Sequence, residues 1–312
     1  MVSPTGPDTG IVRRESGSAT TECSDRVRAM PTDWSMELTI RSTIRLNNGV
    51  EIPRLGLGVY RLAPGEQTRN AIAWALEAGY RQVDTAAFYR NEEDVGRAIR
   101  ESGIPREEVF VTTKLWNDDH GYDRALAALD ASLERLGFDY VDLYLIHWPV
   151  PELRLESWRA LERAYREGKA RAIGVSNYMM RHLEELLSEC EVVPAVNQIE
   201  LTPWSWRSRQ DVVELCRARG IALEAYSPLA KGRKLDDPVL VEVAAHLGRS
   251  PAQVLIRWAL QHDLIVIPKS AHRDRIRENA NVFDFEIPVE LMARLESLDH
   301  GLVTGWDPTE AP

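Results

Sequence analysis

The strongest constraint on this chain is a regular alternation of short, apolar, strand-like runs with longer stretches of helical periodicity. In one such stretch Ala125, Leu129, Leu133 and Leu136 recur at spacings of three and four, and Gly137 ends the pattern. Helical stretches separate eight strand-like runs, at residues 55–58, 82–84, 109–113, 141–146, 172–175, 195–199, 222–225 and 264–267.

Eight β-then-α units between residues 42 and 312 fit a single-domain (β/α)8 TIM barrel, an α/β fold. A doubly wound open sheet is the alternative, since it is built from the same alternation. Ahead of the first unit, Asn48-Gly49 lies between two short β-type runs and supplies the positive φ angles of a tight turn. We therefore predict a barrel preceded by an N-terminal β-hairpin.

Near the C-terminal end, Ser250, Pro251 and Gln253 predict the capped start of a helix.

Residues 1–41 differ from the rest of the chain. They are rich in Ser, Thr, Pro and Gly, mix charges of both signs and have no apolar period, so we expect a disordered N-terminal tail. Met30 and Met36 both precede the first patterned segment. We therefore also consider that the natural start lies later and that the tail is a mis-assigned start.

Composition excludes several classes of protein. The 38 Lys and Arg residues against 48 Asp and Glu residues give a net charge of −10, which argues against a nucleic-acid binder. No apolar run approaches the roughly 20 residues that a membrane-spanning helix needs. Three scattered cysteines, Cys23, Cys190 and Cys216, form no CxxC pair and predict a reducing, cytoplasmic setting.

Common cofactor and hydrolase motifs are absent. Gly56-Leu57-Gly58 is followed by Val59, Tyr60 and Arg61, so the GxGxxG pattern of a Rossmann dinucleotide site is missing. No Walker loop, HExxH pair or GxSxG elbow occurs, and the histidines share no ligand spacing. We predict no metal site.

Four polar residues fall at or just after successive strand ends, where a barrel carries its active site. They are Asp84, Tyr89, Lys114 and His147. This set suits a proton donor: an ammonium lowers the pKa of a phenol, a carboxylate holds the ammonium, and an imidazole orients a substrate oxygen. Each has an ordinary explanation too, since Tyr89 could be a rim aromatic, His147 a core histidine and Asp84–Lys114 a structural ion pair.

The chain resembles the aldo-keto reductase superfamily across about residues 42–298, closest to the bacterial 2,5-diketogluconate reductase-like branch. A short loop at residues 230–238 favours that branch. The motifs that carry the resemblance are Leu55-Gly56-Leu57-Gly58, Asp84-Thr85-Ala86-Ala87-Phe88-Tyr89, Thr113-Lys114-Leu115-Trp116, Ile146-His147-Trp148-Pro149, Ile173-Gly174-Val175-Ser176-Asn177, Pro194-Ala195-Val196-Asn197-Gln198-Ile199-Glu200 and Ile267-Pro268-Lys269-Ser270.

The resemblance implies that Asp84, Tyr89, Lys114 and His147 form the catalytic tetrad and that the barrel binds NADPH without a Rossmann fold. Lys269 and Arg275 would hold the 2′-phosphate, which favours NADPH over NADH, although both could belong to a solvated basic patch. The full set implied for the cofactor is Ser176, Asn177, Gln198, Tyr226, Ser227, Pro228, Leu229, Lys269, Ser270, Arg275, Glu278 and Asn279.

By the same resemblance, the protein reduces an aldehyde, α-ketoaldehyde, keto ester, keto acid or sugar-derived ketone, with Tyr89 as the acid. Candidate walls of the substrate pocket are Tyr60, Trp116, His147, Trp148 and Trp306, although large aromatics at strand ends are often only core or rim. We expect a cytoplasmic monomer that acts on a small molecule. The alternatives are an NADP(H)-binding redox sensor that regulates a protein partner and, more remotely, a scaffold that acts through the tail.

Overall fold

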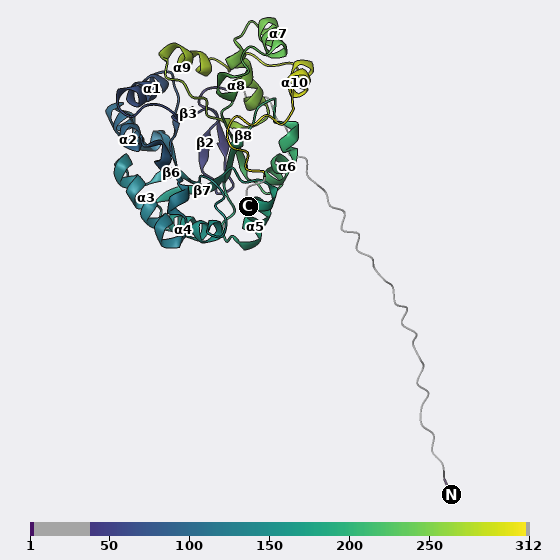
Figure 1. Ribbon diagram of the computed structural model, residues 1–312. Coiled ribbons are helices and arrows are strands. Elements are labelled where there is room, and N and C mark those ends of the chain that lie inside the picture. The colour runs from purple at the N-terminus through teal and green to yellow at the C-terminus, as the bar shows by residue number, and fades with distance from the viewer. Residues whose placement is uncertain (3–37, 310–312) are drawn as a thin grey trace. The chain divides into compact units, whose positions relative to one another are not determined.

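The computed structural model describes residues 1–2 and 38–309 of the chain. In this part, eight strands form one sheet in which every neighbouring pair is parallel, and the strands follow one another in chain order. Figure 1 shows them inside a ring of helices. The strands are β3 (Leu57–Gly58), β4 (Gln82–Asp84), β5 (Phe110–Leu115), β6 (Val141–Ile146), β7 (Ala170–Ser176), β8 (Val196–Glu200), β9 (Ala222–Tyr226) and β10 (Ile265–Val266).

The sheet closes on itself. Leu55 forms an isolated parallel bridge with Val266. Two backbone hydrogen bonds lie beside the bridge, from Gly56 N to Val266 O (2.9 Å) and from Gly58 N to Pro268 O (3.1 Å). The predicted (β/α)8 barrel is confirmed, and the open-sheet alternative is wrong because an open sheet would leave these backbone groups unpaired along two edges.

Helices connect consecutive strands, and their buried faces carry the apolar residues that periodicity predicts. In α3, Ala125, Leu129, Leu133 and Leu136 are buried, and Gly137 ends the helix with a φ of 68°. Ser250 and Gln253 form the predicted capping box of α8. The helices are α1 (Glu66–Glu77), α2 (Glu92–Glu101), α3 (Tyr122–Leu136), α4 (Arg154–Arg166), α5 (Met180–Glu189), α6 (Gln210–Ala218), α7 (Pro238–Leu247), α8 (Pro251–Gln261), α9 (Arg273–Ala280) and α10 (Val289–Glu296).

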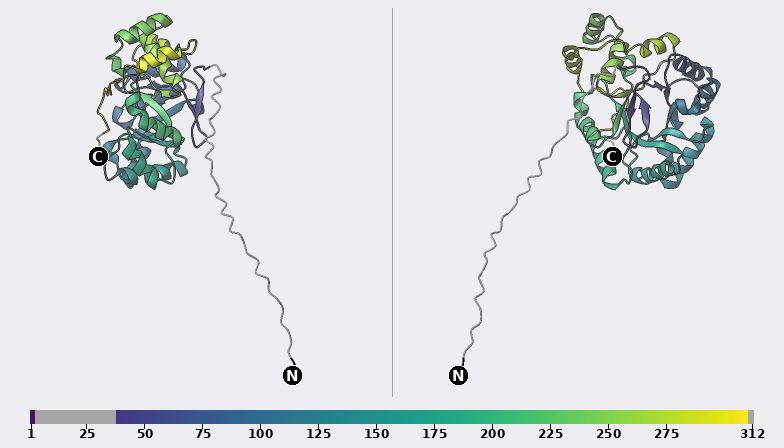
Figure 2. Two further views of the ribbon diagram at one scale, coloured as in Figure 1. Left: turned by 90° about the vertical axis from the view of Figure 1, so that its right-hand side faces the viewer. Right: turned by 180° about the vertical axis from the view of Figure 1, so that it is seen from behind.

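The predicted hairpin closes one end of the barrel. Its strands are β1 (Thr43–Arg45) and β2 (Glu51–Pro53), paired antiparallel, and Leu46 and Ile52 join a buried apolar cluster with Leu143 and Leu145 of β6. In the side view of Figure 2, the hairpin lies at the opposite end of the barrel from the C-terminal segment. The lumen is therefore apolar at the hairpin end, and a larger cluster fills the space between strands and helices.

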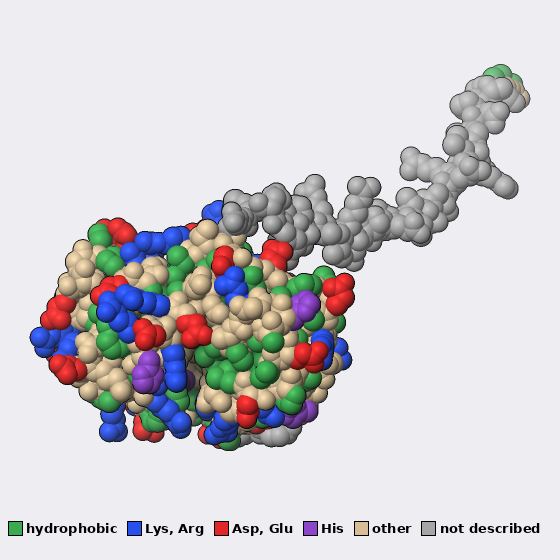
Figure 3. Space-filling view, turned by 90° about the horizontal axis from the view of Figure 1, so that it is seen from above, with side chains coloured by type: hydrophobic (Ala, Val, Ile, Leu, Met, Phe, Trp, Pro, Cys, Tyr) green, Lys and Arg blue, Asp and Glu red, His purple; other side chains and the backbone are tan. Residues whose placement is uncertain are grey.

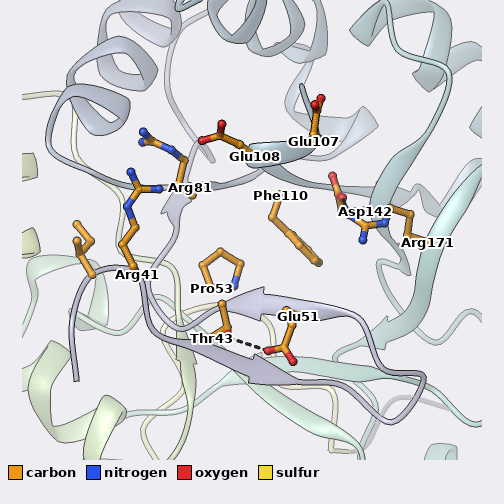
Figure 4. A pocket seen from close by; sticks show the side chains of 11 residues that line it. Arg41, Thr43, Glu51, Pro53, Arg81, Glu107, Glu108, Phe110, Asp142 and Arg171 are labelled. Atoms are coloured by element: carbon orange, nitrogen blue, oxygen red, sulfur yellow. Dashed lines mark hydrogen bonds and ion pairs between the residues drawn. The ribbon is translucent and has the colours of Figure 1, made fainter. Parts of the chain in front are cut away.

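A small cavity of about 230 Å³ lies between the hairpin and the barrel. Figure 4 shows charged side chains of both signs around it. Asp142 accepts hydrogen bonds from Arg171 Nη1 (2.7 Å) and Arg106 Nη2 (2.8 Å), and Thr43 Oγ1 donates to Glu51 Oε2 (2.7 Å). Asp142 thus forms ion pairs with both Arg106 and Arg171.

The predicted tail lies mostly outside the described residues, as do Met30 and Met36. Residues 38–41, which the pattern assigns to the tail, belong to the same compact unit as the barrel. Ile40 packs against the main apolar core, and Ser42 N donates to Thr39 O (3.0 Å). The two apolar residues of this segment, Leu38 and Ile40, are too few to give a periodic signal, which is why the pattern assigned it to the tail.

Candidate active site

The four residues predicted at the strand ends meet at the end of the barrel opposite the hairpin. Asp84 is the last residue of β4, Lys114 lies in β5, and His147 follows β6 directly. Tyr89 ends η1 (Ala87–Tyr89), the short 3-10 helix after β4. Parallel strands bring their carboxyl ends to one edge, so neighbouring strands supply neighbouring side chains.

Lys114 is the centre of this group, with an exposed fraction of 0%. Its Nζ donates to Asp84 Oδ1 (2.7 Å), Asp84 Oδ2 (2.8 Å) and the backbone oxygen of Thr85 (2.8 Å). The Tyr89 hydroxyl lies 3.4 Å from the same nitrogen. A buried ammonium needs this many partners, because it has lost its hydration shell.

The sequence prediction that Lys114 lowers the pKa of Tyr89 is wrong. Burial raises the pKa of the Tyr89 hydroxyl well above its usual value, and Asp84 raises it further. Asp84 contacts Lys114 through both carboxylate oxygens, so its negative charge offsets much of the positive charge at the phenol, and the effect of burial outweighs what remains. Tyr89 is therefore a neutral phenol that holds its proton.

His147 lies beside Tyr89, with its ring centroid 5.7 Å from the phenol centroid. Burial, and then the charge of Lys114, lower the pKa of the His147 imidazole well below its usual value. The backbone oxygen of His147 accepts a hydrogen bond from Asn177 Nδ2 (2.9 Å). A neutral imidazole in a fixed position can orient a polar ligand but carries no charge at neutral pH.

A pocket of about 960 Å³ opens above these residues and is lined by every residue predicted to hold the cofactor. Tyr226 OH donates to Asn177 Oδ1 (2.8 Å), and Ser176 Oγ donates to the backbone oxygen of Gln198 (2.9 Å). Asn177 and Ser227 have φ angles of 63° and 48°. Such left-handed backbone is uncommon outside glycine and concentrates at ligand sites.

Lys269 and Arg275 line the same pocket. Within residues 38–309 neither forms an ion pair with a carboxylate, whereas many other surface arginines do. Burial, and then Arg61, lower the pKa of Lys269, as expected where positive charges converge. The structure thus brings together unpaired basic side chains suited to an anionic group, instead of a patch already balanced by acids.

All five predicted substrate-pocket residues also line the pocket. The Trp148 and Trp306 rings lie 5.0 Å apart, and the Tyr60 and Tyr89 rings 4.9 Å apart. Sequence reasoning missed Phe88, which stacks on Trp116 at 3.8 Å between ring centroids. Its position directly before Tyr89 in the loop was the available signal.

Two further residues were missed below the pocket. Gln198 Nε2 donates to Asp84 Oδ2 (2.8 Å) and to Glu224 Oε2 (2.6 Å), and Gln82 Nε2 donates to Glu224 Oε1 (2.6 Å). A glutamate inside the apolar run 222–225 was the available signal. The tetrad is therefore part of a longer buried polar network.

The described residues contain no cluster of three or more side chains suited to a metal ion, and none of their helices is long and apolar enough to cross a membrane. On the face drawn in Figure 3, acidic and basic side chains are interspersed without a large basic patch.

Comparison with known proteins gives one consistent result. The model of the Aldo/keto reductase family matches residues 54–300. Glyoxal reductase of Bacillus subtilis is 48% identical over 275 residues, covering 88% of this chain and 99% of the relative. The 9,11-endoperoxide prostaglandin H2 reductase of Trypanosoma cruzi is 49% identical over 268 residues, covering 85% and 94%.

Among solved structures, an aldo-keto reductase of Bombyx mori in complex with NADP is similar with a TM-score of 0.78 and 38% identity, covering 86% of this chain and 95% of that one. The resemblance drawn from the sequence motifs is confirmed at the level of the family. The finer assignment to the 2,5-diketogluconate reductase-like branch stays a prediction.

Proposed function

The chain belongs to the Aldo/keto reductase family, and we propose that it uses NADPH to reduce a small aldehyde or ketone to an alcohol, with Tyr89 as the proton donor. One observation carries this proposal. A neutral phenol, a buried ammonium–carboxylate pair and a neutral imidazole lie together at the base of a pocket large enough for a dinucleotide.

The residues around the pocket fit the chemistry of the cofactor. Hydroxyl and amide groups of Ser176, Asn177 and Gln198 suit a carboxamide, and the ring of Tyr226 suits an aromatic face. Lys269 and Arg275 suit the 2′-phosphate, which NADH lacks. Family neighbours crystallised with NADP support the same cofactor. When bound, NADPH supplies the hydride.

The protein's own residues then manage the proton. Tyr89 holds a proton at neutral pH and gives it up only when negative charge develops on the carbonyl oxygen. Lys114, 3.4 Å away, stabilises the phenolate that remains. His147 offers a neutral N–H that orients the carbonyl, and Asp84 keeps Lys114 in place.

Aromatic walls favour a small carbonyl compound. Phe88, Trp116, Trp148 and Trp306 form an apolar surface above His147, and the relative named glyoxal reductase supports an α-ketoaldehyde as the first substrate to test. Keto esters, keto acids and sugar-derived ketones belong to the same panel.

We further propose that the protein acts as a cytoplasmic monomer. Light scattering after size-exclusion chromatography would test the oligomeric state.

The decisive experiment follows NADPH consumption with methylglyoxal, simple aldehydes, keto esters and diketogluconate, for the wild type and for Tyr89→Phe. We expect turnover by the wild type and a loss of at least about a thousandfold in the variant, with NADPH affinity nearly unchanged. Equal rates in the two proteins would contradict the role of Tyr89. Tight NADPH binding without any turnover by the wild type would instead favour the redox-sensor alternative.

A further inference from the structure

A carboxylate with no assigned role, Glu224, lies inside the barrel beneath the candidate active site. It belongs to β9, two residues before Tyr226, and its exposed fraction is 0%. Each of its oxygens accepts a hydrogen bond from a neutral amide, Oε1 from Gln82 and Oε2 from Gln198, both at 2.6 Å. Among the described residues no ammonium or guanidinium group hydrogen-bonds to this carboxylate.

Gln198 connects Glu224 to the tetrad. The same Nε2 that donates to Glu224 also donates to Asp84 Oδ2 at 2.8 Å. An amide nitrogen carries two hydrogens, so both are committed to carboxylates below the pocket. The Oε1 atom of Gln198 is therefore the polar atom left for a ligand, and it can only accept a hydrogen bond.

We propose that Glu224 is a positioning residue for the nicotinamide carboxamide: with Asp84, it locks the Gln198 amide so that its carbonyl oxygen faces the pocket and selects an N–H donor. The inference rests on the proposed function, because the carboxamide belongs to NADPH. Glu224 acts through Gln198 and needs no contact with the cofactor.

A carboxylate suits this task because, when it is ionised, it can accept hydrogen bonds but cannot donate them. A hydroxyl at position 224 could also donate and would allow Gln198 to turn over, whereas an amide held by Gln82 still presents an accepting oxygen to Gln198. The cost is a buried charge: burial, and then Asp84, raise the pKa of Glu224 to about 7. The groups that face it are Gln82 and Asp84 from β4, Lys114 from β5 and Gln198 from β8.

The packing around Gln82 fits its place in this hydrogen-bond network. Gln82 packs so closely on Gly56 that a Cβ atom at position 56 would lie 2.7 Å from Gln82 Cδ. Gly56 thus leaves room for the Gln82 amide to reach Glu224. Gln82 Oε1 is buried without a hydrogen-bond partner among the described residues. If Gln82 turned its amide over, it could accept from a glutamine at position 224, so Glu224→Gln can keep the hydrogen bonds while it removes the charge.

The test measures binding, by quenching of tryptophan fluorescence, of NADP+ and of its 3-acetylpyridine analogue, in which a methyl group replaces the carboxamide NH2. We expect the wild type to bind the analogue about tenfold more weakly than NADP+, because the Gln198 carbonyl then loses its hydrogen-bond donor. The ratio of the two dissociation constants, analogue over NADP+, is the quantity compared among variants. Glu224→Met and Glu224→Leu remove the acceptor and should reduce this ratio to about twofold, since Gln198 is released. Glu224→Gln should restore most of the ratio.

Glu162→Gln is the matched control, because Glu162 is also a buried carboxylate that accepts several hydrogen bonds but lies on α4, outside the network. It should keep the wild-type ratio. A wild-type ratio in folded Glu224→Met or Glu224→Leu would overturn the inference while leaving the proposed function intact. A wild type that neither binds NADP+ nor reduces any carbonyl would overturn the proposed function itself.

A second measurement covers the case in which neither apolar variant folds. Glu224 adds to the raised pKa of Tyr89, whose main causes are burial and Asp84. Alcohol oxidation needs the Tyr89 phenolate, so Glu224→Gln should shift the rise of oxidation rate to lower pH. An oxidation profile identical to the wild type would show that the charge of Glu224 does not act on Tyr89. A fall of the analogue ratio to about twofold in folded Glu224→Gln would overturn the inference.

Discussion

The two ends of the barrel use charged residues in opposite ways. At the hairpin end, Asp142 meets Arg106 and Arg171 in ion pairs whose arginines remain partly exposed. At the pocket end, Lys114 and Asp84 are buried, and Lys269 and Arg275 line the pocket without a carboxylate partner within the described residues. The carboxylates of both ends are buried, so the exposure of the basic partners and the missing counter-charges of Lys269 and Arg275, rather than charge itself, distinguish the two ends.

Two lysines give the sharpest comparison. Lys114 contacts Asp84 at 2.7 Å with an exposed fraction of 0%, and Lys169 contacts Asp130 at 2.6 Å with 34% exposed. We predict that Lys114→Met lowers the turnover number by at least about a thousandfold and the free energy of unfolding by about 3 kcal/mol, because Asp84 is left as an unpaired buried charge. Lys169→Met should change the free energy of unfolding by less than about 1 kcal/mol.

Steady-state kinetics and urea denaturation of both variants check this prediction. If the two substitutions had similar effects on turnover, the distinction between the two ends would be lost.

The next largest effect concerns the unpaired basic residues. Lys269→Ala should weaken NADPH binding by about tenfold or more and leave NADH binding nearly unchanged, because the ammonium has an anionic partner only when the 2′-phosphate is present. Fluorescence titration with both cofactors measures the difference. Lys169→Ala serves as the control from the other end of the barrel, and equal losses for NADPH and NADH would place the phosphate elsewhere.

At the hairpin end, we expect a change in stability without a change in chemistry. Asp142→Asn removes the charge shared by Arg106 and Arg171 and weakens the acceptor of the Val111 amide. The free energy of unfolding should fall by about 2 kcal/mol, while kcat and KM at 25 °C stay within about twofold of the wild type. A large fall in kcat for the folded variant would mean that the two ends are coupled.

The smallest expected effect is the pH dependence of carbonyl reduction. His147 has a pKa well below its usual value and Tyr89 one well above, so from pH 6 to pH 8 the imidazole stays neutral and the phenol stays protonated. With NADPH and substrate saturating, kcat for reduction should vary by less than about twofold over this range. An inflexion near pH 6.5, lost in His147→Gln, would show that the histidine titrates during turnover.

Periodicity predicted the barrel because each strand-like run must be buried on both faces. The run 141–146 coincides with β6, whereas the runs 55–58 and 264–267 are longer than β3 and β10, since the closing contacts reach the sheet through an isolated bridge. Spacing along a strand does not show which side chains meet across a lumen. For that reason Glu224 and Gln82 were missed, and the direction of the Tyr89 pKa was wrong.

The residues around the pocket came from the family motifs, since polar residues at strand ends alone did not separate a catalytic histidine from a core histidine. Phe88 shows the limit of that approach: it belongs to a motif but was not assigned to the substrate wall. Its stacking on Trp116 depends on how two loops approach each other, which a linear motif does not contain.

The closure between Leu55 and Val266 joins segments near the two extremes of the barrel sequence. During synthesis this contact, the seam of the barrel, cannot form until the last strand has left the ribosome. The loop-closure entropy of nearly the whole domain is therefore lost in this late step. Gly58 and Tyr60 line the pocket on one side of the seam, and Ile267 and Lys269 on the other. A ligand that contacts both sides therefore stabilises the closed barrel. It should slow local opening between the segments of Leu55 and Val266, as measured by hydrogen exchange.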